Sequence, residues 1–338
     1  MSWRPTGSAS AVLTCRYCAT DDSFEPAARF EHEGEDRRLF ACPACGSLLY
    51  DPLDVSGNDT AILSERERRI GHKFYLEGGY SADFVARGAL VGLPDGAPVR
   101  FVDIGCATGL ALAFVHSLMN LPVTGFEPTA SGALGREIFD LDIREVWLGA
   151  DTADAAADLT DLPCFLHFNS VLEHLPEPRA TLSALLDIMP VRAVSAVVPN
   201  GLAVDMSAAF INQLAILAPG DHGHLPTPDG MEKLFRSLDF DHVLVSDFGQ
   251  LLHVAASDTP IPALSDRAVG IAAEMFLHRL CEHAHPWVSS GANARLLCRS
   301  AARGDRKAVL RHAEAIGLSP TRRLDEGSFP GGIEAGDW

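Results

Sequence analysis

Apolar and polar residues alternate in blocks along the middle of the chain, where short apolar runs are followed by segments with apolar residues at helical spacing. The first pair of blocks joins an apolar run at 99–104 to a helical pattern at 110–119, across a turn with two glycines. The later blocks predict a strand where the run is short and a helix where the period is that of a helix. Strands are expected at 121–126, 143–148, 163–168, 191–198, 243–248 and 251–255, and helices at 130–140, 180–189, 206–217 and 227–238.

The order of these blocks predicts the fold class. The earlier strands each lead into a helix, which is the pattern of parallel strands joined by helical crossovers. Thr227 followed by Pro228 is a good helix start, with a hydroxyl for capping and a proline in the first turn. The last two strands flank Gly249-Gln250, which suits an antiparallel hairpin. The chain is therefore expected to contain an α/β domain whose parallel sheet is closed by a hairpin.

An acidic residue stands near the end of each of the first two strands, Asp103 and Glu127. The carboxyl ends of neighbouring parallel strands meet at one edge of the sheet, where such folds bind ligands. A carboxylate at that edge can accept hydrogen bonds from both hydroxyls of a ribose. The alternative for Glu127 is a surface acid that caps the following helix. Gly105 lets the backbone turn sharply, and Gly109 lets the helix start lie close to a ligand.

The turn between Gly105 and Leu110 distinguishes two classes of ligand. A dinucleotide fingerprint, G-x-G-x-x-G, is excluded because Ala107 and Leu110 replace its second and third glycines. The segment resembles the D-x-G-x-G-x-G motif of class I S-adenosylmethionine-dependent methyltransferases, with Ala107 at the middle glycine. The resemblance implies S-adenosylmethionine as cofactor and a Rossmann-like sheet of seven strands with helices on both faces. It implies cofactor contacts from Asp103, Gly105, Cys106, Ala107, Gly109, Glu127, Pro128 and Asn169.

Three histidines are candidate catalytic residues. His174 lies in 169–178, directly after the fourth strand, and this segment resembles the E-H-L-x-x-P motif of one methyltransferase branch. A neutral imidazole there can remove a proton from the methyl acceptor, and a structural role for His174 is an equal alternative. His222 and His224 resemble the H-x-H or E-H element that contacts the acceptor in zinc-ribbon-bearing sugar C-methyltransferases. Substrate contact is favoured over metal binding for this pair, because the sequence shows no firm third ligand.

Four of the eight cysteines form two C-x-x-C pairs near the N-terminus. Each pair presents two thiolates from one turn, and two such turns can close a tetrahedral zinc site. With a small hairpin between them, at 29–33 and 38–41, the unit resembles a zinc ribbon and is too small to fold without metal. A redox role would use a single pair, so structural zinc is favoured. The predicted zinc ligands are Cys15, Cys18, Cys42 and Cys45.

These motifs divide the chain into six segments. We expect a disordered N-terminus at 1–14, the zinc ribbon at 15–50, a helical lead-in that covers the pocket at 51–98, the cofactor-binding catalytic domain at 99–257, a helical C-terminal segment at 258–316 and a tail at 317–338. Within the lead-in, helices are expected at 59–70 and 81–90, and Phe74, Tyr75 and Tyr80 are candidates to cover a ligand or to pack in the core. The whole resembles bacterial sugar C-methyltransferases without their large C-terminal α/β domain.

Composition and charge narrow the class of partner. The chain of 338 residues is 47% hydrophobic, which is ample for a large core, and its formal net charge is −18. Because this charge repels phosphate backbones, a small-molecule methyl acceptor, such as a sugar nucleotide or a natural-product intermediate, is favoured over nucleic acid. The alternatives are an RNA methyltransferase and a catalytically silent partner that binds the cofactor. The sequence shows no leader-like start and no bilayer-length apolar run, which predicts a cytoplasmic protein without membrane contact.

Overall fold

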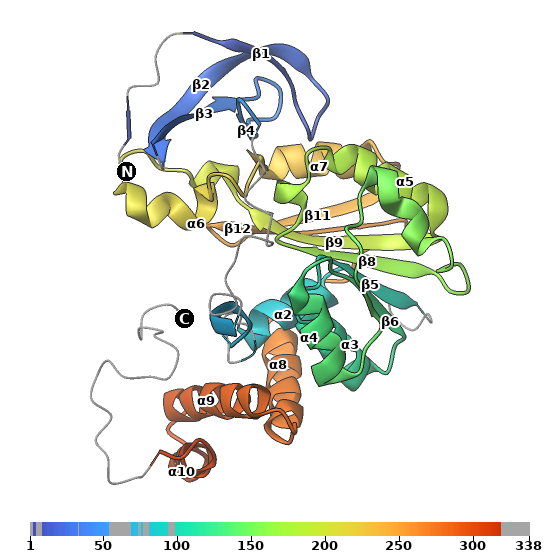
Figure 1. The fold of residues 1–338 in the computed structure, drawn as a ribbon, viewed down its shortest axis with the longest axis vertical. Helices are drawn as coiled ribbons and strands as arrows, with labels where there is room; N and C mark the ends of the chain where they lie inside the picture. Colours follow the sequence, from blue (N-terminus) through green and yellow to red (C-terminus); the bar gives the residue numbers. More distant parts are fainter. Residues whose placement is uncertain are drawn as a thin grey trace.

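The computed structural model describes residues 3–4, 9–32, 34–53, 69–73, 76, 81–93 and 99–318. Its strands form two sheets, a five-stranded sheet that contains the N-terminal strands and a seven-stranded sheet at the centre (Figure 1). Helices cover both faces of the central sheet, and the C-terminal helices lie at the opposite end of the molecule from the N-terminal sheet. The predicted α/β fold with a seven-stranded sheet is therefore confirmed.

The central sheet has the strand order β11-β12-β9-β8-β5-β6-β7. Its strands are β5 Arg100–Ile104, β6 Val123–Phe126, β7 Ile143–Arg144, β8 Cys164–Asn169, β9 Val191–Pro199, β11 His242–Asp247 and β12 Leu251–Ser257. β12 runs antiparallel to β11 and β9, and the remaining adjacent pairs are parallel. The register places Asp103 of β5 opposite Gly125 of β6 and His167 of β8, so the predicted carboxylate lies at the carboxyl end of an inner strand.

Alternating side chains of the central strands build a core on each face of the sheet. Val102 and Ile104 belong to the core that includes α5 and α7, whereas Phe101 and Phe165 belong to the core that includes α2, α3 and α8. The helices are α2 Ala82–Leu90, α3 Leu110–Met119, α4 Ala130–Phe139, α5 Pro178–Ile188, α7 Pro228–Arg236, α8 Asp266–Cys281, α9 Pro286–Ala302 and α10 Arg306–Ala315. The predicted cap of α7 is confirmed, because the Thr227 hydroxyl accepts from the Gly230 amide at 3.1 Å.

Some predicted elements differ from the structure for local reasons. In place of a helix at 206–217 there is a 3-10 turn, η6 Phe210–Gln213, followed by the short α6 Leu214–Leu217. Asp205 closes a separate turn by accepting from the Ser207 amide at 2.8 Å, and Ala218 ends α6 with a left-handed φ of 30°. The strand expected at 143–148 is confined to β7. Residues 59–68, Phe74, Tyr75, Tyr80 and 319–338, which were included in other predictions, lie outside the described residues.

The N-terminal sheet has the order β1-β2-β3-β4-β10 and contains β1 Ala11–Thr14, β2 Asp21–His32, β3 Glu35–Ala41, β4 Leu48–Tyr50 and β10 His224–Leu225. We call Ala11–Tyr50, with both C-x-x-C turns, the cysteine ribbon. The disorder expected at 1–14 is wrong for β1, because these residues pair with β2 and Leu13 packs against the core. The predicted hairpin between the cysteine pairs is present and is longer than expected.

The cysteine ribbon shares its core with the central domain. Phe24 and Phe40 of the ribbon belong to the same buried cluster as Met231 and Leu234 of α7. The sheet itself is also shared, because β10, which lies between β9 and α7 in the sequence of the central domain, pairs with β4. The ribbon is therefore packed onto the α7 side of the molecule as an integral layer (Figure 1).

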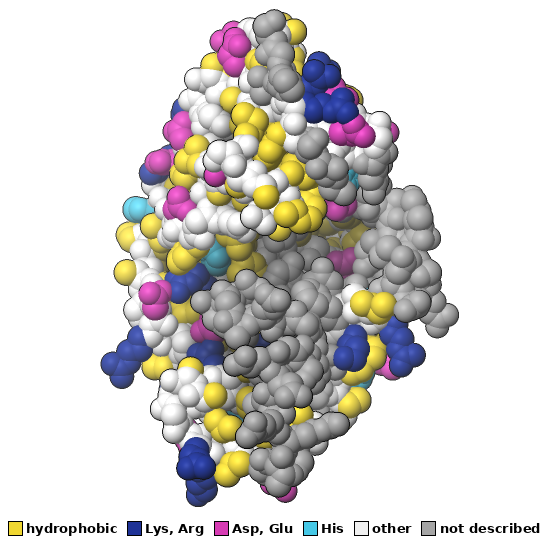
Figure 2. All heavy atoms as spheres, turned by 90° about the vertical axis from the view of Figure 1, so that its left-hand side faces the viewer, with side chains coloured by type: hydrophobic (Ala, Val, Ile, Leu, Met, Phe, Trp, Pro, Cys, Tyr) yellow, Lys and Arg dark blue, Asp and Glu magenta, His cyan; other side chains and the backbone are white. Residues whose placement is uncertain are grey.

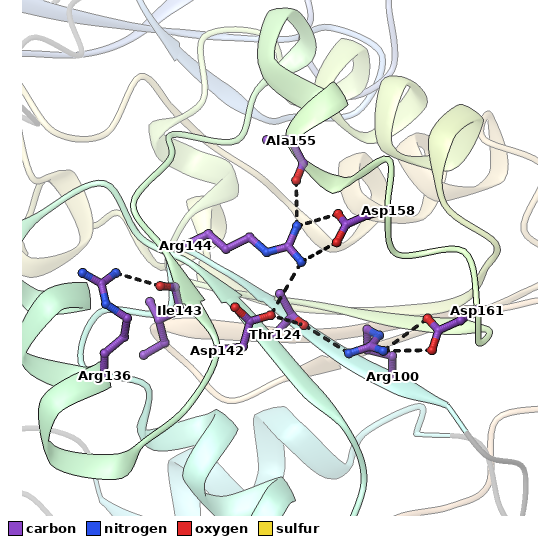
Figure 3. Close-up of polar contacts among 9 residues, drawn as sticks. All are labelled: Arg100, Thr124, Arg136, Asp142, Ile143, Arg144, Ala155, Asp158 and Asp161. Carbon is purple, nitrogen blue, oxygen red and sulfur yellow. Dashed lines mark hydrogen bonds and ion pairs between the residues drawn. The ribbon is translucent and has the colours of Figure 1, made fainter.

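Polar contacts fasten the strands at the β5, β6 and β7 end of the central sheet (Figure 3). Arg100 donates to the Thr124 hydroxyl at 3.3 Å, which links β5 to β6. Arg144 of β7 pairs with Asp158 at 2.6 Å and so anchors the edge strand. Because the backbone oxygen of Arg144 accepts from the Glu127 amide at 2.9 Å, the anchored strand also fixes the residue that follows β6.

Hydrophobic side chains gather on the upper half of the face drawn in Figure 2, where the N-terminal sheet and α6 lie. Leu202 and Ile211, which are 65% and 68% exposed, belong to the segment that leads into α6. No helix in the described part of the chain combines the length and the apolar content needed to traverse a bilayer.

Candidate functional site

The turn after β5 contains three residues in the left-handed conformation, Gly105, Ala107 and Gly109, with φ of 69°, 47° and 75°. Gly105 is required by its surroundings, because a Cβ there would lie 2.6 Å from Val171 Cγ2. A Cβ on Gly109 would lie 2.9 Å from Ile143 Cδ1, so both its positive φ and its close packing against β7 favour glycine here. Ala107 adopts the conformation that a glycine would hold at lower cost.

Glu127 lies directly beside this turn, as the sequence predicts. Its Oε2 accepts from the Ala107 amide at 2.9 Å, and its Oε1 accepts from the Thr129 amide at 3.0 Å. The left-handed Ala107 therefore directs its N–H toward the carboxylate. The second contact reaches the N-cap residue of α4, so the alternative of an acid at the helix start also describes part of what Glu127 does.

Buried oxygen atoms without a hydrogen-bond partner collect at the carboxyl ends of β5 and β8. Within the described residues they are Asp103 Oδ1, Asn169 Oδ1 and Glu173 Oε2. Asp103 is 2% exposed, and burial together with the charge of Glu127 raises its pKa well above the ordinary value. Because an orphaned acceptor is costly to bury, these atoms point to a ligand that donates hydrogen bonds.

The other two predicted cofactor residues differ in exposure. Cys106 is buried, and burial together with the charges of Asp103 and Glu127 raises the pKa of its thiol. Its sulfur fills the space beside Gly125, where a Cβ would come within 2.6 Å of it. Pro128 is exposed and follows Glu127 at the sheet edge. Cys106 is therefore a packing residue of the turn, and Pro128 lies at its rim.

Glu173, His174 and His222 converge on one point, and we call them the Glu–His–His cluster. Their ligand atoms all lie within 4.8 Å of one another. Nε2 of His174 and Nε2 of His222 are 4.0 Å and 3.9 Å from Glu173 Oε1, and the two rings meet edge to face at 4.9 Å. The sequence did not indicate that Glu173 meets His222, which lies 49 positions later in the chain.

Burial favours the neutral form of every member of this cluster. Glu173 is 1% exposed, and its burial raises its pKa to about 8. Burial, with the charge of His174 as a second cause, lowers the pKa of His222 to about 4, and burial also lowers the pKa of His174. A single charge in the cluster, whether on the Glu173 carboxylate or on a protonated imidazole, is therefore costly unless an opposite charge binds beside it.

His224 does not join the cluster, which corrects its prediction as a base. It is fully buried, its Nε2 lies 2.8 Å from the Leu175 carbonyl oxygen, and its Nδ1 contacts the hydroxyl of Tyr17 in the first C-x-x-C turn. A carbonyl only accepts, so Nε2 carries the proton and Nδ1 accepts from Tyr17. With both nitrogens occupied, His224 joins the ribbon to the loop after β8. No sequence motif indicated this role for Tyr17.

The four predicted zinc ligands meet in one group, in which Cys15, Cys42 and Cys45 are buried and Cys18 is half-buried. Cys15 Sγ is 3.6 Å from Cys45 Sγ, Cys18 Sγ is 3.5 Å from Cys42 Sγ, and all four are free thiols. Four thiolates around one tetrahedral zinc would stand about 3.8 Å apart. The two turns have matching backbones, because the residue after each pair donates to the carbonyl of its first cysteine, at 3.0 Å and 2.8 Å. The group therefore has the donors and the geometry for one tetrahedral cation.

Comparisons with known proteins identify the family to which this chain belongs. A family profile described as "Methyltransferase domain" matches residues 75–245, half of the chain. A search of curated proteins finds no match. Similar solved structures include the plantazolicin methyltransferase BpumL in complex with SAH, at 12% identity and TM-score 0.42, covering 57% of this chain and 91% of that one. A SAM-dependent methyltransferase from Archaeoglobus fulgidus is similar at 14% identity and TM-score 0.39, covering 48% and 86%.

Proposed function

We propose that this chain, which belongs to the methyltransferase-domain family, transfers a methyl group from S-adenosylmethionine to a small molecule bound where β5 and β8 end. This class includes the sugar nucleotides and natural-product intermediates suggested by the sequence. A net charge of −18 supports it, because a polyanionic acceptor such as RNA would be repelled.

The observation that carries the cofactor assignment is the pairing of Glu127 with the turn after β5. We propose that Glu127 accepts from the ribose hydroxyls, and that the orphaned oxygens of Asp103 and Asn169 accept from donors of the cofactor, including its amino group. These acceptors fit S-adenosylmethionine, which carries hydroxyl and ammonium donors and a positive sulfur. When bound, the cofactor supplies a methyl group that its positive sulfur activates for displacement.

Methyl transfer asks the protein mainly for alignment of donor and acceptor. Holding two reactants in line is worth about 7–11 kcal/mol of barrier. Glu173 and His174 of the Glu–His–His cluster lie in the turn that follows β8, and we propose that the cluster contacts the acceptor. His174 and His222 each keep one nitrogen free of hydrogen bonds toward Glu173, so these two histidines, and not His224, remain candidates for chemistry on the acceptor.

We further propose that Cys15, Cys18, Cys42 and Cys45 bind one structural zinc ion. The match between the sulfur–sulfur separations and a tetrahedral site supports this assignment. Four thiolates leave no open coordination position, so the ion would stabilise the ribbon and take no part in methyl transfer.

The test is isothermal titration calorimetry with S-adenosylhomocysteine. Glu127→Ala should lose at least tenfold in affinity, because two charge-assisted hydrogen bonds and the support of the Ala107 turn are removed together. Glu137→Ala, which removes an exposed acid of α4, is the matched control and should bind as the wild type does. Equal affinity in Glu127→Ala and wild type, or no binding to wild type, would refute the cofactor assignment.

A further inference from the structure

We propose that Glu173, His174 and His222 form a second metal site, distinct from the cysteine ribbon, which binds a divalent first-row transition ion beside the methyl acceptor. The sequence disfavoured a metal at His222 and His224 because no third ligand was evident. In the fold, Glu173 and His174 lie beside His222 and complete a set of three ligands, and His224 takes no part in it. The metal site itself does not depend on the proposed function, and only the assignment of the methyl acceptor as a further ligand of the ion rests on it.

The two histidines are held in one protonation state that suits a metal ligand. His174 Nδ1 lies 2.9 Å from the Asp221 carbonyl oxygen, and His222 Nδ1 lies 2.8 Å from the Ile216 carbonyl oxygen. A carbonyl oxygen can only accept, so both Nδ1 atoms carry hydrogen and both Nε2 atoms present a lone pair. Metal-binding histidines are oriented in this way by a hydrogen bond from the second ring nitrogen.

Both lone pairs lie near the same carboxylate, one oxygen of which has no hydrogen-bond partner among the described residues. The Nε2 atoms stand 3.9 Å and 4.0 Å from Glu173 Oε1, which is too far for hydrogen bonds, and Glu173 Oε2 has no partner among the described residues. When Glu173 is ionised, three electron-pair donors thus surround one point with no proton between them. A cation at that point would satisfy all three at once, whereas hydrophobic packing satisfies none.

The cluster is already close to the size that coordination requires. Metal–ligand bonds of about 2.1 Å in a tetrahedral arrangement place neighbouring ligand atoms about 3.4 Å apart. The two separations between histidine Nε2 and Glu173 Oε1, 4.0 Å and 3.9 Å, must therefore shorten by roughly half an ångström. The backbone holds the parts together, because the Gly223 amide donates to the Glu173 carbonyl at 2.9 Å and the His222 amide donates to the Ala218 carbonyl at 2.8 Å. Binding therefore requires side-chain adjustment and leaves the loops in place.

The donor set indicates the class of ion and its role. Two imidazoles and one carboxylate suit zinc, cobalt, nickel or iron(II) better than magnesium or calcium, which prefer oxygen ligands throughout. Three protein ligands also leave coordination positions open, unlike the four thiolates of the ribbon. We assign one open position to an oxygen atom of the methyl acceptor, so the ion would hold that oxygen near the end of β8.

Cobalt titration of the full-length protein tests the site, because cobalt reports its ligands by absorbance. The protein is first dialysed against a weak chelator, and its thiolate-bound metal content is then measured. Wild type should bind about one further cobalt ion per chain without any new thiolate-to-metal charge-transfer band. Glu173→Gln and His222→Ala should weaken this binding at least tenfold. Asp239→Asn is the control, since it removes the charge of an exposed acid that follows α7.

The outcomes separate this proposal from the proposed function. Failure of wild type to bind cobalt beyond the thiolate site would overturn the second site, whatever the variants do. Undiminished cobalt binding by both Glu173→Gln and His222→Ala would overturn the ligand assignment. Calorimetry with S-adenosylhomocysteine on the same samples checks folding and tests cofactor binding independently, because Glu127 lies outside the cluster.

Discussion

Replacing Tyr17 with phenylalanine should loosen the loop that carries His222 while leaving the cofactor turn intact. Tyr17 is fully buried, and burial raises its pKa well above the ordinary value, so its hydroxyl stays protonated and donates to His224 Nδ1. The aromatic rings meet edge to face at 5.0 Å, and phenylalanine preserves that packing. The substitution therefore removes one donor and leaves one buried acceptor unpaired.

The expected cost follows from that orphaned nitrogen. A buried acceptor that loses its partner destabilises a fold by about 1–3 kcal/mol, and the imidazole of His224 is fully buried. Urea unfolding of Tyr17→Phe should show this loss. Turnover of the methyl acceptor should fall as well, because His222 is two residues from His224 on the same loop. Affinity for S-adenosylhomocysteine should not change, since Glu127 and the Ala107 turn lie on other strands.

Tyr50→Phe is the matched control for Tyr17→Phe. Tyr50 is also buried in the ribbon and donates to the Leu217 carbonyl at 3.0 Å, so its loss costs stability without touching His224. Turnover should therefore fall further in Tyr17→Phe than in Tyr50→Phe at equal stability. The additivity error of such measurements is about 0.3–0.5 kcal/mol. If the free energy of unfolding of Tyr17→Phe lies within about 0.5 kcal/mol of that of wild type, the hydrogen bond does not couple the ribbon to the loop.

Three further predictions concern the sheet, the turn and the ribbon. His167 is fully buried, and its burial lowers its pKa to about 3. The unfolded chain therefore binds more protons than the folded chain between about pH 3 and 6.5, so the free energy of unfolding falls on acidification by up to about 1.4 kcal/mol per pH unit. His167→Gln should reduce the difference between urea melts at pH 7 and pH 5. Gly105→Ala should cost about 1–3 kcal/mol more than Gly220→Ala in the same melts, because both positions have positive φ but only the first meets a side chain, and equal costs would refute the clash. Cys42→Ser should lower both zinc content and melting temperature, and unchanged zinc by metal analysis would remove Cys42 from the site.

The sequence predicted those parts of the molecule whose signal is local. The limits of α3 match the predicted 110–119, because the apolar period and the flanking glycine and asparagine mark both ends. The position of Glu127 beside the Ala107 turn was also predictable, since neighbouring parallel strands present their carboxyl ends at one edge. Both results depend only on strand order and period.

The parts that were missed depend on contacts between distant segments. β10 is a strand of two residues, and nothing near His224 indicates that it pairs with Leu49. The meeting of Glu173 with His222 likewise depends on how two loops fold back toward each other. The motif containing His224 suggested catalysis, whereas tertiary structure gave its nitrogens to Tyr17 and Leu175. A histidine motif fixes residue types in a loop, but hydrogen-bond partners decide which imidazole remains available.

The ribbon and the candidate acceptor site form one mechanical unit, which gives the proposed zinc a consequence beyond stability. Thr227 caps α7 and also donates to the Cys45 carbonyl at 2.5 Å, so the second C-x-x-C turn is fastened to the helix after His224. The first C-x-x-C turn reaches the same loop through Tyr17. Each thiolate turn thus holds one end of the segment from His224 to Thr227. Loss of zinc would release both ends together, so acceptor turnover should depend on ribbon metal even though that metal has no open coordination position.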